Sequence, residues 1–194
     1  MGEKNQEEKD REKQGKPESV IKEIFSWVFS FTLAFLAAFF VKHYLIINAD
    51  VPTGSMENTI MPGDRLVGNR LAYWRDDPQR GDVIIFHYPD NEEELFVKRV
   101  IGLPGETVVI EEGKIYIDGS EKALPEEYLK EVWTEETGPY LFEVPDDSYL
   151  VLGDNRNDSW DARYWSNTYV DKDKILGEAV LIYFPFSHFG KLSD

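Results

Sequence analysis

The sequence predicts a mainly β protein in which an N-terminal transmembrane helix is followed by an exterior domain of antiparallel sheets with few short helices. The helix is predicted from an apolar run at residues 24–41, which contains no charged residue. The sheets are predicted from short runs of β-branched and aromatic residues beyond position 80, separated by glycine, proline and aspartate. These features divide the chain into a tail at 1–20, an anchor at 21–47 and a β domain at 48–194.

The apolar run is almost long enough to cross a bilayer by itself. Its 18 residues span about 27 Å as a helix, against a hydrocarbon core of about 30 Å. Continuing the helix to Ile47 supplies the missing length, provided that the ammonium of Lys42 reaches the headgroups and His43 lies at the interface. A buried core helix is the alternative, but such a helix seldom lacks a polar face over this length.

The charges that flank the anchor predict its orientation. Six lysine and arginine residues precede the apolar run, whereas the twenty residues after Val41 contain only Lys42. Because positive residues favour the cytoplasmic side, we expect a single-pass protein of the cell membrane with a cytoplasmic N-terminus and an extracytoplasmic β domain. The tail is rich in charge and almost devoid of apolar residues, which predicts disorder. The lengths of the tail and of the apolar run argue against a removable signal peptide.

The composition of residues 48–194 excludes several classes of function. This segment holds 30 acidic and 14 basic residues, and such a surface repels nucleic acid. The sequence contains no cysteine, which excludes thiol catalysis, disulfides and thiolate metal sites. The three histidines, His43, His87 and His188, are scattered without metal-ligand spacing. Each is therefore expected to be an interfacial or surface residue.

The exterior domain contains several runs that are typical of strands. The predicted strands lie at residues 83–88, 95–101, 107–110, 114–117, 149–152 and 179–183. Glu112-Gly113 lies between two of these runs and predicts a hairpin. Helices are expected only locally, near 126–131 or 171–174. The polar stretch at 121–139 is expected to be an excursion between strands.

The run Pro-Thr-Gly-Ser-Met at 52–56 follows the anchor and presents a candidate nucleophile, Ser55. Gly54 permits the sharp turn that exposes such a residue, and Pro52 fixes the backbone that enters the turn. Because alternate residues of an extended chain project to the same side, Thr53 and Ser55 can both face a bound carbonyl group. From these positions alone, a turn composed of small residues explains the pattern equally well.

A serine hydroxyl needs a base to accept its proton, and Lys98 is the candidate. A lysine acts as a base only when it is neutral, which its ordinary pKa of about 10.4 permits for roughly one molecule in 2,500 at pH 7. Burial among apolar groups lowers the pKa of a lysine, and Lys98 follows Leu95, Phe96 and Val97 in an apolar run. The alternative, which composition alone favours, is that Lys98 and Arg99 are ordinary surface cations on a strand.

Five segments of the exterior domain, in their order along the chain, resemble the conserved boxes of bacterial type I signal peptidases. They are Pro-Thr-Gly-Ser-Met-Glu-Asn-Thr-Ile (52–60), Gly-Asp-Arg-Leu (63–66), Arg-Gly-Asp-Val-Ile-Ile-Phe (80–86), Val-Lys-Arg-Val-Ile-Gly-Leu-Pro-Gly-Glu (97–106) and Gly-Asp-Asn-Arg-Asn-Asp-Ser-Trp-Asp-Ala-Arg-Tyr-Trp (153–165). The short chain and its single anchor resemble the compact form of this family. Two departures are Ala162, where a serine is common, and Trp160, which is expected to affect the substrate pocket.

The resemblance implies a membrane-bound serine endopeptidase that removes signal peptides from exported preproteins through an acyl-enzyme formed by a Ser-Lys dyad. In such an enzyme Ser55 is the nucleophile and Lys98 is its base. The Ser55 backbone N–H and the Thr53 hydroxyl form the oxyanion hole, and Ser159 orients the lysine. The implied structural support comes from an ion pair of Asp161 with Arg163 and from Asp154 and Arg156 in the same loop.

The resemblance also implies the substrate and the partners. Family members cut after small residues at positions −1 and −3 of preproteins, and the substrate binds as an added extended strand. The residues matched to the substrate pockets are Val51, Pro52, Met56, Phe96 and Val97. The expected partners are signal peptides of secreted preproteins, the lipid bilayer and the nearby protein translocation machinery, with no nucleic acid. No metal or cofactor is expected.

Two other interpretations account for part of the pattern. Self-cleaving repressors of the bacterial damage response also use a serine and a lysine on a related β fold, but they are soluble, whereas this chain has a predicted anchor. A noncatalytic membrane-anchored β domain explains the anchor and the strands equally well. It does not explain the separate serine, lysine and Gly-Asp-Asn-Arg segments.

Overall fold

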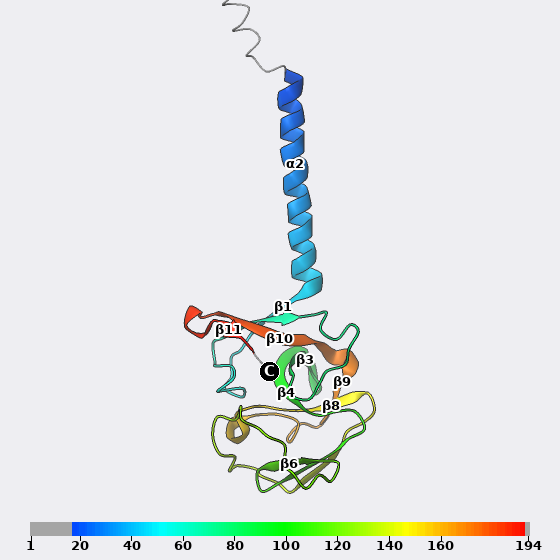
Figure 1. Cartoon of the computed structure of the whole chain (residues 1–194), viewed down its shortest axis with the longest axis vertical. Helices are drawn as coiled ribbons and strands as arrows, with labels where there is room; N and C mark the ends of the chain where they lie inside the picture. The colour runs from blue at the N-terminus through cyan, green and yellow to red at the C-terminus, as the bar shows by residue number, and fades with distance from the viewer. Residues whose placement is uncertain (1–16, 193–194) are drawn as a thin grey trace, which may run out of the picture. The chain divides into compact units, whose positions relative to one another are not determined.

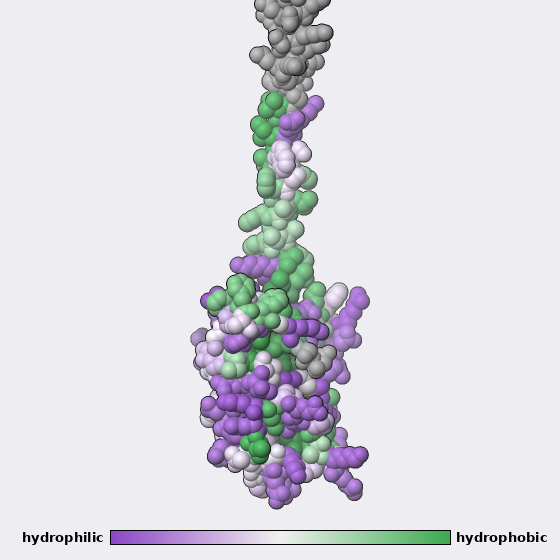
Figure 2. Space-filling model, turned by 60° about the vertical axis from the view of Figure 1, so that its left-hand side comes forward, coloured by the Kyte–Doolittle hydropathy of each residue, from purple (hydrophilic) through white to green (hydrophobic). Residues whose placement is uncertain are grey.

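The computed structural model describes residues 17–192, which belong to two units, one ending at Tyr44 and one beginning at Leu45. Helix α2 (Pro17–Phe40) is continued by a short π-helical segment, η1 (Val41–Leu45) (Figure 1). The helical stretch from Val20 to Leu45 is long and apolar enough to cross a membrane. Apolar side chains cover much of the helix surface in Figure 2. This stretch is therefore a candidate membrane anchor.

The predicted anchor at 21–47 extends two residues too far. Ile46 and Ile47 begin strand β1 (Ile46–Asp50), where they pair with Asn69 and Gly68. Ile47 is only 4% exposed and belongs to the core of the β domain, so its apolar character reflects packing against protein. A continuous apolar run hides this boundary because periodicity does not distinguish the end of a helix from a short buried strand.

The second unit consists of antiparallel β-sheets, as the sequence predicts. Its larger sheet has eight strands in the order β1-β2-β10-β3-β4-β8-β9, with β11 paired to β10. Every pairing in this sheet is antiparallel. Besides β1, its strands are β2 (Arg65–Asn69), β3 (Val83–Tyr88), β4 (Asn91–Gly102), β8 (Ser148–Leu152), β9 (Val170–Asp171), β10 (Ile175–Phe184) and β11 (Gly190–Lys191).

The smaller sheet has three strands in the order β6-β5-β7. They are β5 (Thr107–Glu111), β6 (Lys114–Ile117) and β7 (Tyr140–Glu143). The predicted hairpin between β5 and β6 is confirmed, and its turn residues Glu112 and Gly113 have φ angles of 50° and 70°. Positive φ at both central positions is typical of the tight turn that joins two strands. Strand β7, which pairs with β5 across a long excursion, was not predicted.

The helices described in the second unit are three 3₁₀ turns, η2 (Arg156–Asp158), η3 (Lys172–Lys174) and η4 (Phe186–His188). The helix predicted near 171–174 is confirmed as η3, whereas the one near 126–131 is wrong. The excursion predicted at 121–139 is confirmed, because these residues form neither helix nor strand. Several of its backbone groups bond instead to the side chains of Asn58 and Asn157. Residues 1–16 of the predicted tail lie outside the described residues.

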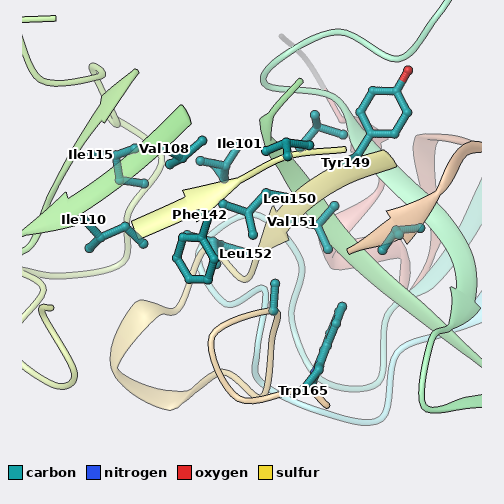
Figure 3. Packing of buried hydrophobic residues seen from close by; sticks show 14 of the residues in the cluster. Ile101, Val108, Ile110, Ile115, Phe142, Tyr149, Leu150, Val151, Leu152 and Trp165 are labelled. Atoms are coloured by element: carbon teal, nitrogen blue, oxygen red, sulfur yellow. The ribbon is translucent and has the colours of Figure 1, made fainter. Parts of the chain in front are cut away.

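Two hydrophobic cores stabilise the second unit. The larger core joins the two sheets, because side chains of β8 pack with those of β5, β6 and β7 (Figure 3). The smaller core includes Met56 and Ile60 from the loop between β1 and β2, and these side chains are 1% and 0% exposed. Burying an apolar side chain of this size contributes about 1.5–3 kcal/mol. The loop that carries Ser55 is thus held at two buried points.

Candidate active site

The candidate nucleophile Ser55 lies in a closed loop between β1 and β2. The N–H of Val51 donates to the carbonyl of Asp64 at 3.0 Å, and the N–H of Gly63 donates to the carbonyl of Val51 at 2.7 Å. These two bonds close the base of the loop, while Met56 directly after the serine is buried. Ser55 itself is 7% exposed, so its hydroxyl is held in one place and is largely shielded from water.

Lys98 lies on β4, where it pairs with Ile84 of β3. Its side chain is 3% exposed, and its Nζ lies 2.6 Å from Ser55 Oγ. The next residue, Arg99, projects to the other side of the strand and binds Asp154, as the alternation of a strand requires. The two residues expected to form a dyad are therefore in hydrogen-bond contact although 43 positions separate them.

Burial lowers the pKa of Lys98 to about 8, because the ammonium loses its hydration in the protein interior. The negative charges of Asp161 and Asp154 oppose this effect and raise the pKa of Lys98. With a pKa near 8, roughly one Lys98 side chain in ten is neutral at pH 7. Lys98 is thus available as a base far more often than an ordinary surface lysine.

We expect the rate of substrate cleavage to rise with pH up to about 8 and then to level off. The neutral amine is the form that accepts a proton, and below its pKa of about 8 this form decreases tenfold for each pH unit. The measurement is kcat/KM as a function of pH, which reports the free enzyme. An inflection near the ordinary lysine value of 10.5 would contradict the proposed effect of burial.

Thr53 and Ser159 are the two further hydroxyls expected at the site. Thr53 Oγ1 lies 3.4 Å from Ser55 Oγ, so the two hydroxyls face the same space. Ser159 is 8% exposed, and its Oγ has no hydrogen-bond partner among the described residues. The structure therefore does not link Ser159 to Lys98 by a hydrogen bond, and the lysine-orienting role of Ser159 stays a prediction.

The loop that follows β8 packs directly against the backbone of Ser55. The backbone N–H of Asn155 donates to the Ser55 carbonyl at 3.1 Å, and Asn155 Nδ2 donates to the Gly54 carbonyl at 3.0 Å. A Cβ atom on Gly153 would lie 2.4 Å from the Ser55 carbonyl oxygen and 2.1 Å from Ser159 Oγ. Only glycine permits this approach, which explains why the sequence needs glycine at the start of the segment 153–165.

Three buried ion pairs lie beneath the site. Arg163 binds Asp161 at 2.8 Å, as predicted, and both side chains are fully buried. Asp154 and Arg156, expected to support the same loop, form their ion pairs with residues outside that loop, while Arg156 Nε also donates to the Gly153 carbonyl within it at 2.9 Å. The three pairs are Asp161 with Arg163, Asp154 with Arg99 and Arg156 with Glu126. Arg99 and Glu126 were not predicted as structural residues, although the apolar neighbours of Arg99 on β4 were a signal that it is buried.

A cleft of about 310 Å³ opens beside the Ser55 and Lys98 side chains. All five residues predicted for substrate binding line it: Val51, Pro52, Met56, Phe96 and Val97. Trp160, which was expected to affect the substrate pocket, also lines the cleft, and further lining comes from Asp50, Leu95 and Asp158, which were not predicted. Trp160 Nε1 donates to Tyr88 OH at 3.2 Å, which fixes the indole at the edge of the cleft. Within residues 17–192, no group of three or more His, Asp or Glu side chains is placed to hold a metal ion.

Comparisons with known proteins identify the family. A model described as signal peptidase, peptidase S26, matches residues 24–184. A probable signal peptidase I-2 of Synechocystis sp. is 41% identical over 149 residues, which cover 74% of this chain and 66% of that protein. Signal peptidase I of Leptolyngbya laminosa is 40% identical and is covered over 70% of its length, with 73% of this chain aligned.

Among solved structures, a signal peptidase I from Enterococcus faecalis V583 is 37% identical, with 53% of this chain and 97% of that chain covered and a TM-score of 0.44. The family model extends over most of the chain, from the apolar helix to the end of β10. It confirms the resemblance of the five sequence segments, and the chain belongs to the signal peptidase family, peptidase S26.

Proposed function

We propose that this chain is a membrane-bound serine endopeptidase that removes signal peptides from exported preproteins, with Ser55 as nucleophile and Lys98 as general base. The observation that carries the proposal is the 2.6 Å contact between Ser55 Oγ and Lys98 Nζ beside an open cleft. Family membership supports the reaction class. It favours this function over a self-cleaving repressor or a noncatalytic β domain.

The first half of the proposed reaction forms an acyl-enzyme. Neutral Lys98 Nζ accepts the hydroxyl proton of Ser55 while Oγ bonds to the scissile carbonyl carbon, whose oxygen becomes an oxyanion. The tetrahedral intermediate then collapses, the C–N bond breaks, and the Lys98 ammonium donates its proton to the departing amine. The mature protein leaves, and the signal peptide stays esterified to Ser55.

The second half hydrolyses this ester. Lys98 Nζ, now neutral again, accepts a proton from a water molecule whose oxygen attacks the ester carbonyl carbon. When the second intermediate collapses, the bond to Ser55 Oγ breaks and the ammonium returns the proton to the serine. The products are the signal peptide with a free carboxylate and the regenerated enzyme. Each step uses only side chains, backbone and water.

Thr53 is the proposed side-chain donor of the oxyanion hole, together with the Ser55 backbone N–H. Thr53 Oγ1 lies beside the attacking oxygen, 3.4 Å from it. Removing one such donor typically lowers kcat by about 10²–10³. We therefore expect Thr53→Val to lower kcat by this order with little change in KM, and Thr53→Ser to be nearly wild type. If threonine served only packing and strand propensity, valine would be harmless and serine slightly worse.

The cleft beside the serine suits an extended peptide with small side chains. Apolar side chains form most of its lining, and Trp160 is fixed at its edge. A substrate lying along this cleft gains affinity from backbone hydrogen bonds, while the limited volume selects small residues at −1 and −3. The five predicted binding residues are the proposed walls of these pockets.

The proposed orientation places the N-terminus in the cytoplasm and the β domain outside. It rests on the excess of basic residues before the apolar helix. In this orientation the site lies on the side of the membrane where exported preproteins emerge, so the bilayer and the translocation machinery are the proposed neighbours.

The proposed function is tested by incubating the purified full-length chain in detergent with a preprotein that carries a signal peptide. We expect one cut, after a small residue at −1, identified by sequencing the N-terminus of the product. The matched substrate control has phenylalanine at −1 and should not be cut there. An enzyme preparation that leaves the first preprotein intact, or cuts both equally, would contradict the proposal.

A further inference from the structure

Residues 126–135, within the excursion between β6 and β7, contact the turn that carries Ser55. Asn58 Nδ2, three residues beyond the serine, donates to the carbonyl oxygen of Tyr128 at 3.0 Å. Lys130 forms an ion pair with Glu57, two residues beyond the serine. The segment therefore touches the Ser55 turn at two consecutive positions.

The same segment also holds the loop that follows β8. Asn157 Oδ1 accepts the backbone N–H groups of Thr134 at 2.8 Å and Glu135 at 3.0 Å. Asn157 Nδ2 donates to the carbonyl of Val132 at 2.9 Å. One side chain of the loop is thus bound by three backbone groups of the segment, which restrains the loop two residues before Ser159.

Tyr128 is the point where the segment meets β4. Its ring centroid lies 4.0 Å from Arg99 Cζ, and Arg99 is the residue next to Lys98. Its hydroxyl donates to Glu126 Oε1 at 2.8 Å, and Glu126 binds Arg156 at 2.7 Å. The side chains of Arg156 and Glu126 are only 1% and 7% exposed. A single aromatic side chain therefore contacts the buried ion pairs of both β4 and the loop.

We propose that Tyr128 is a positioning residue that keeps Ser55 and Lys98 in reactive contact. Ser55 and Lys98 come from different elements, and the loop after β8 packs against the serine backbone, so their separation depends on how these three parts lie together. The 126–135 segment contacts all three parts. A displacement of about 1 Å can lower the rate of such a reaction by as much as 10²-fold. This inference rests on the Ser-Lys chemistry proposed above.

The test compares variants of the full-length chain in detergent at a temperature where circular dichroism shows them folded. Tyr128→Leu removes the ring over Arg99 and should lower kcat per folded molecule at least about tenfold with KM unchanged. Tyr128→Phe keeps the ring and should recover most of this loss. Tyr116→Leu, the same replacement at a half-buried tyrosine of β6, is the matched control and should leave kcat unchanged.

Asn58→Gly provides a second variant that does not touch the buried groups. Asn58 is exposed and has a φ angle of 86°, which glycine adopts readily, so only the bond to Tyr128 is lost. It should lower kcat a few-fold without changing KM. The inference is overturned if both Tyr128→Leu and Asn58→Gly match the control in kcat, or if either changes KM alone.

A crystal structure of Tyr128→Leu separates this inference from the proposed function. We expect the distance between Ser55 Oγ and Lys98 Nζ to be longer than the 2.6 Å of the wild-type chain. An unchanged distance would overturn the positioning role even if the wild-type chain cleaves preproteins. A longer distance supports that role whatever the wild-type turnover, which tests the proposed function separately.

Discussion

Replacing Lys98 with methionine is expected to abolish preprotein cleavage and at the same time to stabilise the fold. Without the amine, nothing accepts the Ser55 proton, so kcat should fall by at least about 10³. The buried ammonium also opposes folding at neutral pH, because burial lowers its pKa from 10.5 to about 8. Removing that penalty should raise the free energy of unfolding at pH 7 by about 3 kcal/mol.

The pH dependence of this gain in unfolding free energy follows from the lowered pKa of Lys98. Below pH 8 both the folded and the unfolded wild-type chain hold the proton, and the penalty for the buried charge is complete. Between about 8 and 10.5 only the unfolded state keeps the proton, so the penalty and the gain of Lys98→Met diminish; above 10.5 they vanish. Urea unfolding at several pH values measures this change.

Ser55→Ala is the matched control for the methionine variant. It should lose cleavage to the same extent, because nucleophile and base act as one unit, but it keeps the buried amine and should gain no comparable stability. Cleavage by Lys98→Met above about a thousandth of the wild-type rate would reveal a different base. A methionine variant less stable than wild type at pH 7 would show that bonds made by the ammonium outweigh its burial.

Asp161→Asn is expected to have the largest effect on stability. The side chains of Asp161 and its partner Arg163 are both fully buried, and Asp161 also accepts the backbone N–H of Gly153 at 3.0 Å. Asparagine keeps the size and the acceptor for Gly153 but leaves the guanidinium of Arg163 without a charged partner. Breaking a buried pair in this way typically costs about 3–5 kcal/mol, measured as the loss of unfolding free energy in urea.

The same variant should change the pH profile of cleavage. The charge of Asp161 raises the pKa of Lys98 against the effect of burial, so its removal should lower that pKa. The rise of the cleavage rate with pH should then occur at lower pH. Asp77→Asn is a suitable control, because Asp77 pairs with Lys172 at an exposed position and should affect neither property. If the cleavage rate of Asp161→Asn rises at the same pH as that of the wild-type chain, the expected electrostatic effect of Asp161 on Lys98 is excluded.

Local sequence patterns predict those strands whose ends are marked by turn residues. The strand at 83–88 lies between Gly81-Asp82 and Pro89 and is found with these bounds as β3. β7 was missed because Tyr140–Glu143 is a short run of four residues whose structure depends on pairing with β5. The end of the anchor was misplaced for a related reason: Ile46 and Ile47 become a strand only because β2 lies beside them.

In the candidate site, too, the sequence predicts individual residues but not their partners from distant parts of the chain. The resemblance to signal peptidases predicted Ser55 and Lys98 as the catalytic pair, and the structure places the two side chains in contact. The partners of Asp154 and Arg156 could not be predicted, because Arg99 lies 55 residues from Asp154 and Glu126 lies in a polar stretch without regular structure. Only the folded arrangement shows which charges are buried together.

The neighbours Lys98 and Arg99 point to opposite sides of β4. The candidate site therefore depends on the exact register of β4 with its neighbouring strands β3 and β8. Sliding β4 by one residue would exchange the two sides. A guanidinium, which stays protonated throughout the accessible pH range, would then face Ser55 and could never accept its proton. A slip in the opposite direction would instead bring the amine of Lys98 to the place of Arg99 beside Asp154, where pairing would favour its charged form. A single inserted or deleted residue between β3 and Lys98 could therefore silence the enzyme while leaving every chemical group of the site in the chain.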